Sequence, residues 1–562
     1  MRRGVARAAL CASVLSAAPS LLAAQVCDGY RINSIRIRNA GLFDGDNRVP
    51  RWVESLAGAL SWRTRASVVA NDLRFSEGDE CDPLYLAETE RLLRLRPYLR
   101  SAAIRTTPAP GGQVDVEVDT RDDWSLGGDL SIAFHDRVEF RSLRLTETNL
   151  MGQGILGRLR VDRRGREPGV VFDGLHPHLM RINYLQVQGG QTSVGPVAAV
   201  NVYRPFETEL DRFGWFVGAS RLEEPFGLHT DSIGPVTVPR LRQTFGINAQ
   251  RRIGPEGLQV MGGVSVLYHR ITQSGPALAS DPANDSAAQA GLAGAYSDVR
   301  RFSVAVSAGA RAIRRVAHSR LDAVHAIEDV SEGLEVRVSL GRALAISDLQ
   351  PDWFAMAEGY LGAHVAGRTL LFVRTRTEGL RRPGATRWHD LIASGDVLTY
   401  TPSGRRGVIA LAVRAAGGWR MRQPFQLSLG EGEGMRGYGR GHAVGRRVVA
   451  HGEYRHYAGT LRGIGDVGWA AFVDVGRGWA GGIPFAADHP WQAAAGGGLR
   501  FSLPPGSKYV ARMDLAVPLR GGPVELRFST RQHFTILRQE AADVARSRQP
   551  MSTQPPFNSF PY

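Results

Sequence analysis

The chain has 562 residues, of which 43% are apolar, with 66 glycines and a formal net charge of +15. Beyond the N-terminal segment, no apolar run reaches the roughly 18 residues that a transmembrane helix needs, so a helical membrane protein is excluded. The positive charge is carried by arginines spread along the chain, with a single lysine, and not by one basic helix or loop. We therefore expect no nucleic-acid partner.

Residues 1–24 have the pattern of a cleavable signal peptide, with arginines, an apolar stretch and then small residues. We expect cleavage after Ala24, with Ala23 as the alternative. Export places the mature chain where disulfides form, so its two cysteines, Cys27 and Cys81, are a candidate pair within one small domain. Two unpaired thiols are the alternative.

Residues 25–121 predict one small α/β domain. The expected elements, in chain order, are a strand at Ile32–Ile37, a helix from an N-cap at Thr64 to Leu73, a helix from an N-cap at Asp82 to Pro97, and strands at Ala102–Thr106 and Val114–Val118. The order is therefore strand, helix, helix, strand, strand. An α/β domain of another periplasmic kind shares this pattern and stays open as the alternative.

Residues 122–538 alternate between apolar and polar side chains in segment after segment, without helical spacing. Leu334 and Val336 on either side of Glu335 are one example, and such alternation is typical of a membrane barrel with apolar residues outside and polar residues inside. A soluble sandwich also alternates, but it lacks long loops such as Thr272–Ser297. We expect an even number of strands, which counting alone does not determine.

A glycine-rich stretch, Leu429–Gly441, lies between two strand-like segments. The spacing of Gly432, Gly434 and Gly437 matches the dinucleotide-binding fingerprint, which requires a helix directly after it. Val448–Tyr457 alternates like a strand instead, so we expect no nucleotide site.

Arg436 within this stretch is the main candidate functional residue. If this loop enters the barrel, its arginine stays charged and is costly to bury alone, so a carboxylate should meet it. Asp474 is the expected partner, because Val473 and Val475 on either side of it would face lipid and turn it inward. Glu453 is a second candidate, although the ordinary polarity of a lumen is the favoured explanation for it.

The runs Met435-Arg-Gly-Tyr438 and Phe472-Val-Asp-Val-Gly476 each occur once and in this order. Together with the strand–helix–helix–strand–strand domain, they resemble the superfamily of POTRA-containing outer-membrane barrels, which includes the BamA and TamA assembly factors, bacterial surface antigens and two-partner secretion translocators. The resemblance implies an all-β transmembrane β-barrel of sixteen antiparallel strands preceded by one small α/β POTRA domain. It also implies a latch in which Arg436, Gly437 and Tyr438 fold into the lumen and Asp474, in the strand motif with Gly476, partners the arginine.

The function that the resemblance implies is translocation or insertion of polypeptides across or into the outer membrane, with the client captured by the POTRA domain and the lumen gated by the Arg-Gly-Tyr loop. The implied partners are outer-membrane lipid and lipopolysaccharide, an unfolded polypeptide client, and the machinery that inserts the barrel itself. A solute-conducting channel and a structural surface antigen, with the POTRA domain as a docking module only, are the alternatives. In each case we expect the protein to lie in the outer membrane, with the POTRA domain and the C-terminal tail in the periplasm.

Residues 539–562 predict a disordered tail from their Ser/Gln/Pro-rich end. In the family, an aromatic residue that ends the closing strand directs assembly, and either Phe534 or Tyr562 fits that role. No Gly-x-Ser-x-Gly elbow or other catalytic constellation occurs, so we expect no enzymatic activity. His451 and Glu453 on one strand face supply at most half a metal site, so we expect neither a metal nor another cofactor.

Overall fold

The computed structural model describes residues 27–44, 49–134, 138–163, 167–230, 232–344, 349–430, 434–438, 442–522, 524–530 and 540–548, with only the backbone described for 130–134, 138–141 and 542. The predicted signal peptide, Phe534, Tyr562 and the tail beyond residue 548 lie outside these residues. Within them, no helix combines the length and the hydrophobicity that crossing a membrane requires.

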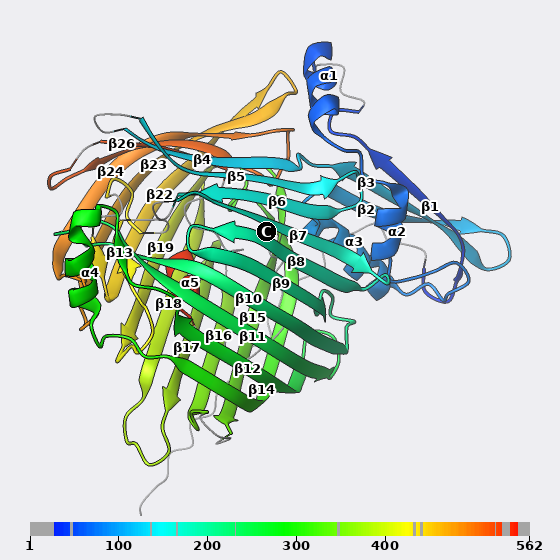
Figure 1. The fold of residues 1–562 in the computed structure, drawn as a ribbon. Coiled ribbons are helices and arrows are strands. Elements are labelled where there is room, and N and C mark those ends of the chain that lie inside the picture. Colours follow the sequence, from blue (N-terminus) through cyan, green and yellow to red (C-terminus); the bar gives the residue numbers. More distant parts are fainter. Residues whose placement is uncertain are drawn as a thin grey trace, which may run out of the picture.

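The N-terminal part of the described chain is an α/β domain (Figure 1). Its elements are β1 (Arg31–Ala40), α1 (Arg51–Leu60), α2 (Ala66–Asp72), α3 (Pro83–Leu95), β2 (Leu99–Ala109) and β3 (Gln113–Asp122). The sheet order is β1-β3-β2, with β1 parallel to β3 and β2 antiparallel to it. Val69, Leu93 and Val118 belong to the buried core, and Cys27 and Cys81 are joined by a disulfide.

The helix caps of this domain follow the sequence in one case and not in the other. The Asp82 side chain accepts a hydrogen bond from the Leu84 N–H, as the predicted cap of α3 requires. The predicted cap at Thr64 is wrong, because α2 begins after Arg65 and the Thr64 hydroxyl instead accepts a hydrogen bond from Asn149 of the barrel. The predicted elements do not include α1, although its apolar residues from Trp52 to Leu60 lie on one face of the helix.

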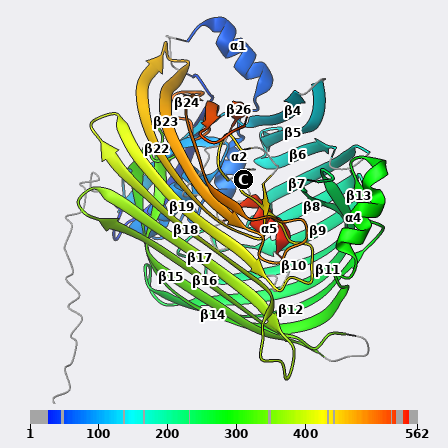
Figure 2. The same ribbon diagram turned by 90° about the vertical axis from the view of Figure 1, so that its left-hand side faces the viewer.

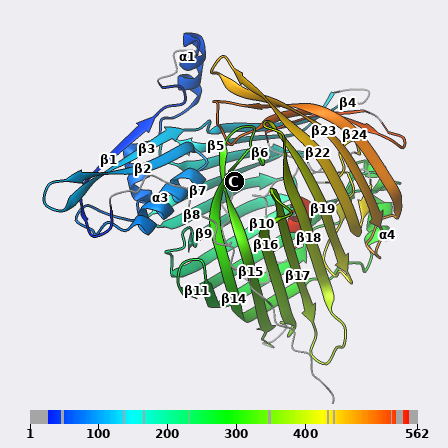
Figure 3. The same ribbon diagram turned by 180° about the vertical axis from the view of Figure 1, so that it is seen from behind.

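Most of the remaining described chain forms a closed barrel with 20 strands in its wall, together with the two-residue β13, which pairs with the end of β11 (Figure 3). The strands are β4 (Leu126–Phe134), β5 (Val138–Leu150), β6 (Ile155–Asp162), β7 (Gly169–Leu179), β8 (Asn183–Thr192), β9 (Gly195–Arg204), β10 (Phe213–Leu228), β11 (Val236–Ile253), β12 (Gln259–Gln273), β13 (Leu278–Ala279), β14 (Val299–Ser319), β15 (Ile327–Ala343), β16 (Trp353–Val365), β17 (Thr369–Arg381), β18 (His389–Ser403), β19 (Gly407–Trp419), β22 (Arg446–Leu461), β23 (Gly465–Trp479), β24 (His489–Ser502), β25 (Ala511–Pro518) and β26 (Glu525–Ser529). β26 lies beside β4 and closes the wall. The expected count of sixteen is wrong, because short strands such as β6 and turns as short as the one between β8 and β9 fit more strands into the same length.

The barrel wall has an apolar outer face and a polar inner face. On β15, Leu334, Val336 and Val338 are 52%, 44% and 44% exposed, whereas Arg337 and Ser339 between and after them are buried. This confirms the predicted alternation. The outer face presents hydrocarbon side chains, as a wall in contact with lipid requires, and the inner face carries the charges.

The two ends of the barrel differ (Figures 1 and 2). The α/β domain lies across the end with shorter turns, and longer connections lie at the other end. There, the expected loop at Thr272–Ser297 contains β13, η1 (Pro282–Asn284) and α4 (Asp285–Leu292).

A further helix, α5 (Ala542–Ser547), lies inside the barrel (Figure 2). The predicted disordered tail is therefore wrong for residues 540–548. Val544 of α5 is 1% exposed and packs in a lumen cluster with Phe425 and Leu427, and this burial stabilises an ordered segment that its composition does not indicate.

Candidate functional site

The described parts of the connection between β19 and β22, residues 420–430, 434–438 and 442–445, fold into the barrel at the end opposite the α/β domain. Its β20 (Leu427–Ser428) and β21 (Ala443–Val444) pair with each other. Beyond this short ladder, Met435 and Arg436 are 0% and 1% exposed. This is the loop that the resemblance assigns to a latch.

Arg436 is held by two carboxylates. Its Nε and Nη2 donate to Asp474 Oδ2 and Oδ1, both at 2.8 Å, and its backbone N–H donates to the same Oδ2 at 3.0 Å. Its Nη1 donates to Glu453 Oε2 at 2.6 Å, and the guanidinium carbon lies 3.5 Å from the centre of the Phe472 ring. The forked pairing and the ring contact together fix the plane of the guanidinium. The structure thus places Asp474 where the sequence expects it and adds Glu453 as a direct partner.

Strand register explains why these groups converge. His451 of β22 lies opposite Asp474 of β23, and Glu453 lies opposite Phe472. Because side chains two positions apart on a strand share a face, all four point into the lumen. The imidazole Nδ1 of His451 lies 3.0 Å from Asp474 Oδ1, so this histidine contacts the site.

Glu453 is shared among three arginines. Besides Arg436, it accepts hydrogen bonds from Arg455 Nε at 2.9 Å and Arg500 Nη2 at 3.3 Å. Arg500 in turn pairs with Asp514 of β25. Sequence reasoning missed these three further members of the site, and the only signal for them was their inward position on alternating strands. In a lumen shielded from water, such a network distributes the cost of buried charge over several pairs.

The close approach of the loop to the wall depends on two glycines. Gly437 has a φ of +82°, which favours glycine, and its N–H donates to Glu525 of β26 at 2.7 Å. A Cβ at Gly476 would lie 2.6 Å from Met435 Sδ, so a side chain here would displace the buried Met435. Tyr438 donates its hydroxyl to a backbone carbonyl of β24 at 2.9 Å. The loop tip therefore contacts β23, β24 and the closing strand β26.

α5 ties this loop to other strands from inside the lumen. Asp543 pairs with Arg447 of β22 and accepts a hydrogen bond from the Ser428 N–H at 3.2 Å. At the other end of the helix, Arg548 pairs with Glu378 of β17 at 3.1 Å. The helix and the loop thus occupy the lumen together.

Buried ion pairs fasten the α/β domain to the barrel mouth. Arg96 pairs with Asp72 inside the domain and with Glu207 in the turn after β9. Arg94 Nε donates to Asp329 Oδ2 of β15 at 2.9 Å. Burial alone would raise the pKa of the Asp72 carboxyl, but the charge of Arg96 outweighs it and holds this pKa below its usual range.

Lys508, the only lysine of the chain, completes this interface from the turn between β24 and β25. Its Nζ donates to the backbone carbonyls of Arg94 and Leu99 in the α/β domain. Burial lowers the pKa of Lys508 to about 8. The domain thus contacts turns that lie far apart around the rim.

Comparison with known proteins leaves the family open. No family profile matches the chain, and no curated protein sequence matches it. Solved structures that resemble it include BamA from Haemophilus ducreyi lacking POTRA domains 1–3, with 12% identity, a TM-score of 0.34 and coverage of 89% of this chain and 83% of that one. CdiB from Acinetobacter baumannii has 12% identity, a TM-score of 0.36 and coverage of 84% of this chain and 74% of that one. CdiB from Escherichia coli has 11% identity, a TM-score of 0.33 and coverage of 91% of each chain. At these TM-scores, the superpositions carry no conclusion about this chain.

Proposed function

We propose that this chain is an outer-membrane barrel of the POTRA-containing superfamily that moves polypeptides across or into the outer membrane. The observation that carries the proposal is an α/β domain with an open sheet edge, seated across the mouth of a barrel with an apolar outer face and a charged lumen. The outer face meets lipid and lipopolysaccharide, and the cell's assembly machinery inserts the barrel. No step of this function requires a catalytic residue or a cofactor.

The edge of β2 is where an extended client would add. The edge of β1 is already occupied by the segment before α3, since the Ile32 N–H donates to Asp79 O at 2.9 Å and the Cys81 N–H donates to Tyr30 O at 2.8 Å. The disulfide of Cys81 holds that segment in place. Among the described strands β2 pairs only with β3. Its Ile104 N–H already donates to Glu90 Oε2 at 2.9 Å, so a client strand would gain backbone hydrogen bonds along the exposed residues beyond Ile104.

The gate in this proposal has two parts, the Arg436 loop and α5. Both occupy the lumen, so a polypeptide passes only when they move. Because the Gly437 N–H is bonded to Glu525 of β26, release of the loop is coupled to the closing strand of the barrel.

The test places a photo-crosslinking amino acid at Thr107, an exposed position on β2, and at Asn33 of β1 as the matched control. With the protein in liposomes and an unfolded outer-membrane polypeptide added, we expect crosslinks at Thr107 several-fold above those at Asn33. Solute flux without crosslinks would instead establish the channel alternative. If neither solute flux nor crosslinks are observed, the interpretation as a structural surface protein remains.

A further inference from the structure

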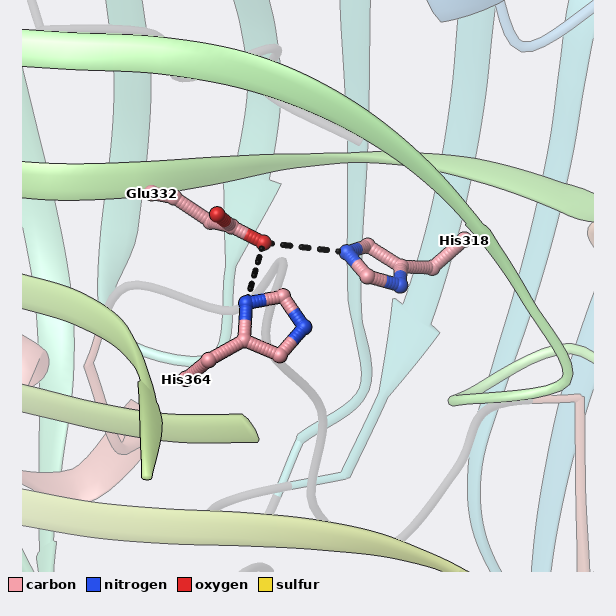
Figure 4. A group of neighbouring side chains, drawn as sticks. All are labelled: His318, Glu332 and His364. Atoms are coloured by element: carbon pink, nitrogen blue, oxygen red, sulfur yellow. Dashed lines mark hydrogen bonds and ion pairs between the residues drawn. The ribbon is translucent and has the colours of Figure 1, made fainter. Parts of the chain in front are cut away.

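Three metal-ligand side chains meet at the end of the barrel that holds the α/β domain (Figure 4). His318 lies at the end of β14, Glu332 near the start of β15 and His364 at the end of β16. One ligand atom of each lies within 4.8 Å of the others. No sequence motif joins them, because each belongs to a different strand and only the pairing of the strands brings them together.

Two of the three spacings between these atoms are those of a coordination sphere, and the two imidazole nitrogens lie within 4.8 Å of each other. His318 Nε2 lies 3.2 Å and His364 Nδ1 lies 3.1 Å from the same oxygen, Glu332 Oε1. In a tetrahedral zinc site with bonds of about 2.0–2.1 Å, neighbouring ligand atoms are about 3.3 Å apart. An ion therefore needs only small side-chain movements to bind all three atoms. Two imidazoles and a carboxylate are also a donor set that zinc and related divalent metals prefer.

The carboxylate is already oriented by a neighbour. Arg314 Nη2 donates to Glu332 Oε2 at 2.9 Å, which leaves Oε1 directed at the imidazoles. Outer hydrogen bonds of this kind position metal-binding carboxylates. The Glu332 side chain is 4% exposed and that of His364 is 41% exposed, so solvent reaches the group and can supply the remaining ligand.

We propose that His318, Glu332 and His364 bind one divalent transition-metal ion of the zinc class, with water in the open position. The ion ties β14, β15 and β16 together at the rim. Asp329, which forms an ion pair with Arg94 of the α/β domain, lies on the same strand as Glu332. The site therefore stiffens the part of the rim on which the domain is seated, and it does so whether or not the chain moves polypeptides.

The test uses the full chain folded in detergent micelles. Titration of metal-free protein with Zn²⁺ should show one saturable site, and Co²⁺ should give the visible absorption bands of a low-coordinate site. His318→Ala and His364→Ala should each weaken Zn²⁺ binding at least tenfold, and the isosteric Glu332→Gln should do the same without disturbing the fold. His325→Ala, at the same barrel end and outside the group, should bind normally. Each variant must first show the heat-modifiable folded band.

Two results would overturn this site. One is no saturable binding by the folded parent chain, which would leave the three side chains as an ion-pair cluster with Arg314. The other is unchanged binding in the His318→Ala/His364→Ala double variant, which would put the metal elsewhere.

A second and independent observation concerns α1. Trp52, Leu56 and Leu60 are 68%, 53% and 44% exposed, and Trp62 beyond the helix is 51% exposed. Residues four apart lie above one another on a helix, so the first three form one apolar stripe. Beside this stripe, Val53 and Ala57 of the same apolar face are packed in a cluster with Leu42, Phe43 and Val49, and Trp124, Ile464 and Leu503 lie against it.

This packing attaches α1 to the barrel rim. Ile464 and Leu503 belong to the turns after β22 and β24, and Figures 1 and 2 show α1 standing beside the barrel wall at that end. Leu461 and Leu499, close to these turns in sequence, are 54% and 55% exposed on the outer face. The apolar stripe of α1 therefore lies at the edge of the apolar outer face of the barrel.

We infer that α1 lies in the membrane interface, with Trp52, Leu56 and Leu60 in the acyl region. Arg51 and Arg63 at the two ends of this segment meet anionic headgroups there. This inference rests on the membrane location in the proposed function.

The test attaches a nitroxide spin label in liposomes at Leu56→Cys, at Val336→Cys on the barrel outer face, and at Arg105→Cys, whose side chain is 65% exposed on the α/β domain. We expect oxygen accessibility typical of lipid at positions 56 and 336 and of water at 105. A lipid signal at 336 with an aqueous one at 56 would overturn the role of α1 alone. Aqueous signals at both would overturn the membrane location itself.

Discussion

At Arg436 the cost of burying a guanidinium is offset by two carboxylates, Asp474 and Glu453, and by the face of Phe472. Breaking a well-buried ion pair by removing one partner costs about 3–5 kcal/mol, because the other charge stays buried without it. Here Asp474 would still contact His451, and Glu453 would still contact Arg455 and Arg500, if Arg436 were removed. These remaining contacts reduce the free-energy cost of losing any single one.

The first prediction concerns this network. Arg436→Ala should free the loop more than Asp474→Asn or Glu453→Gln does, because either of those variants leaves the arginine with one carboxylate. The measurement is the rate of proteolysis between β20 and β21 in folded protein. Double-variant cycles should give coupling above about 0.5 kcal/mol for both pairs. Arg337→Ala, which breaks the lumen pair with Glu358 elsewhere on the wall, is the control and should leave the loop resistant.

If the effects of Arg436→Ala and Glu453→Gln on loop stability simply add, while those of Arg436→Ala and Asp474→Asn do not, then only the pair of Arg436 with Asp474 holds the loop. That is the pair that the sequence indicates. Additivity with both would show that the loop is held by its apolar contacts and by α5.

At the scale of elements, the disulfide between Cys27 and Cys81 pins the segment before α3 along the edge of β1. Cross-links of this loop size stabilise by about 2–4 kcal/mol. We predict that Cys27→Ser/Cys81→Ser lowers the stability of the α/β domain and uncovers β1, so that photo-crosslinks to client appear at Asn33. Equal crosslinking at Asn33 with and without the disulfide would show that other contacts cover this edge.

The docking of the α/β domain should depend on pH through Lys508. Its pKa in the docked state is lowered to about 8 from the usual lysine value of 10.5. Between these two values the undocked state binds a proton that the docked state does not, so docking becomes more favourable as the pH rises through this window. Below pH 8 Lys508 is protonated in both the docked and the undocked state, so it adds no further pH dependence to the docking free energy.

Spin-label distances between α3 and the barrel rim, measured from pH 7 to pH 10, check this prediction. Lys508→Met should abolish the change, because methionine fills the same space without titrating. A pH dependence that persists in Lys508→Met would assign the effect to another group.

At the scale of the whole molecule, the barrel encloses a lumen that α5 and the Arg436 loop occupy together. We predict that Asp543→Asn/Arg548→Gln, which removes the ion pairs of α5 with Arg447 and Glu378, increases ion conductance in planar bilayers several-fold. Arg387→Gln on an exposed rim position is the control and should conduct like the parent. Unchanged conductance in the double variant would show that the Arg436 loop alone closes the lumen.

The sequence by itself determined the features that depend on neighbours along the chain. The two-residue alternation of Leu334, Glu335 and Val336 predicts a wall with a polar inside, because a strand turns successive side chains to opposite faces. The cap at Asp82 and the inward position of Asp474 follow from equally local rules.

Only the tertiary structure decided which distant segments meet. Strand number and register depend on how all strands close into one wall, and no local pattern encodes them. That register places Glu453 and Asp474 where both reach Arg436 of the loop, and it brings His318, Glu332 and His364 together. The order of α5 likewise comes from burial against Phe425 and Leu427, residues far earlier in the chain, since its own six residues are too few to hold a helix in water.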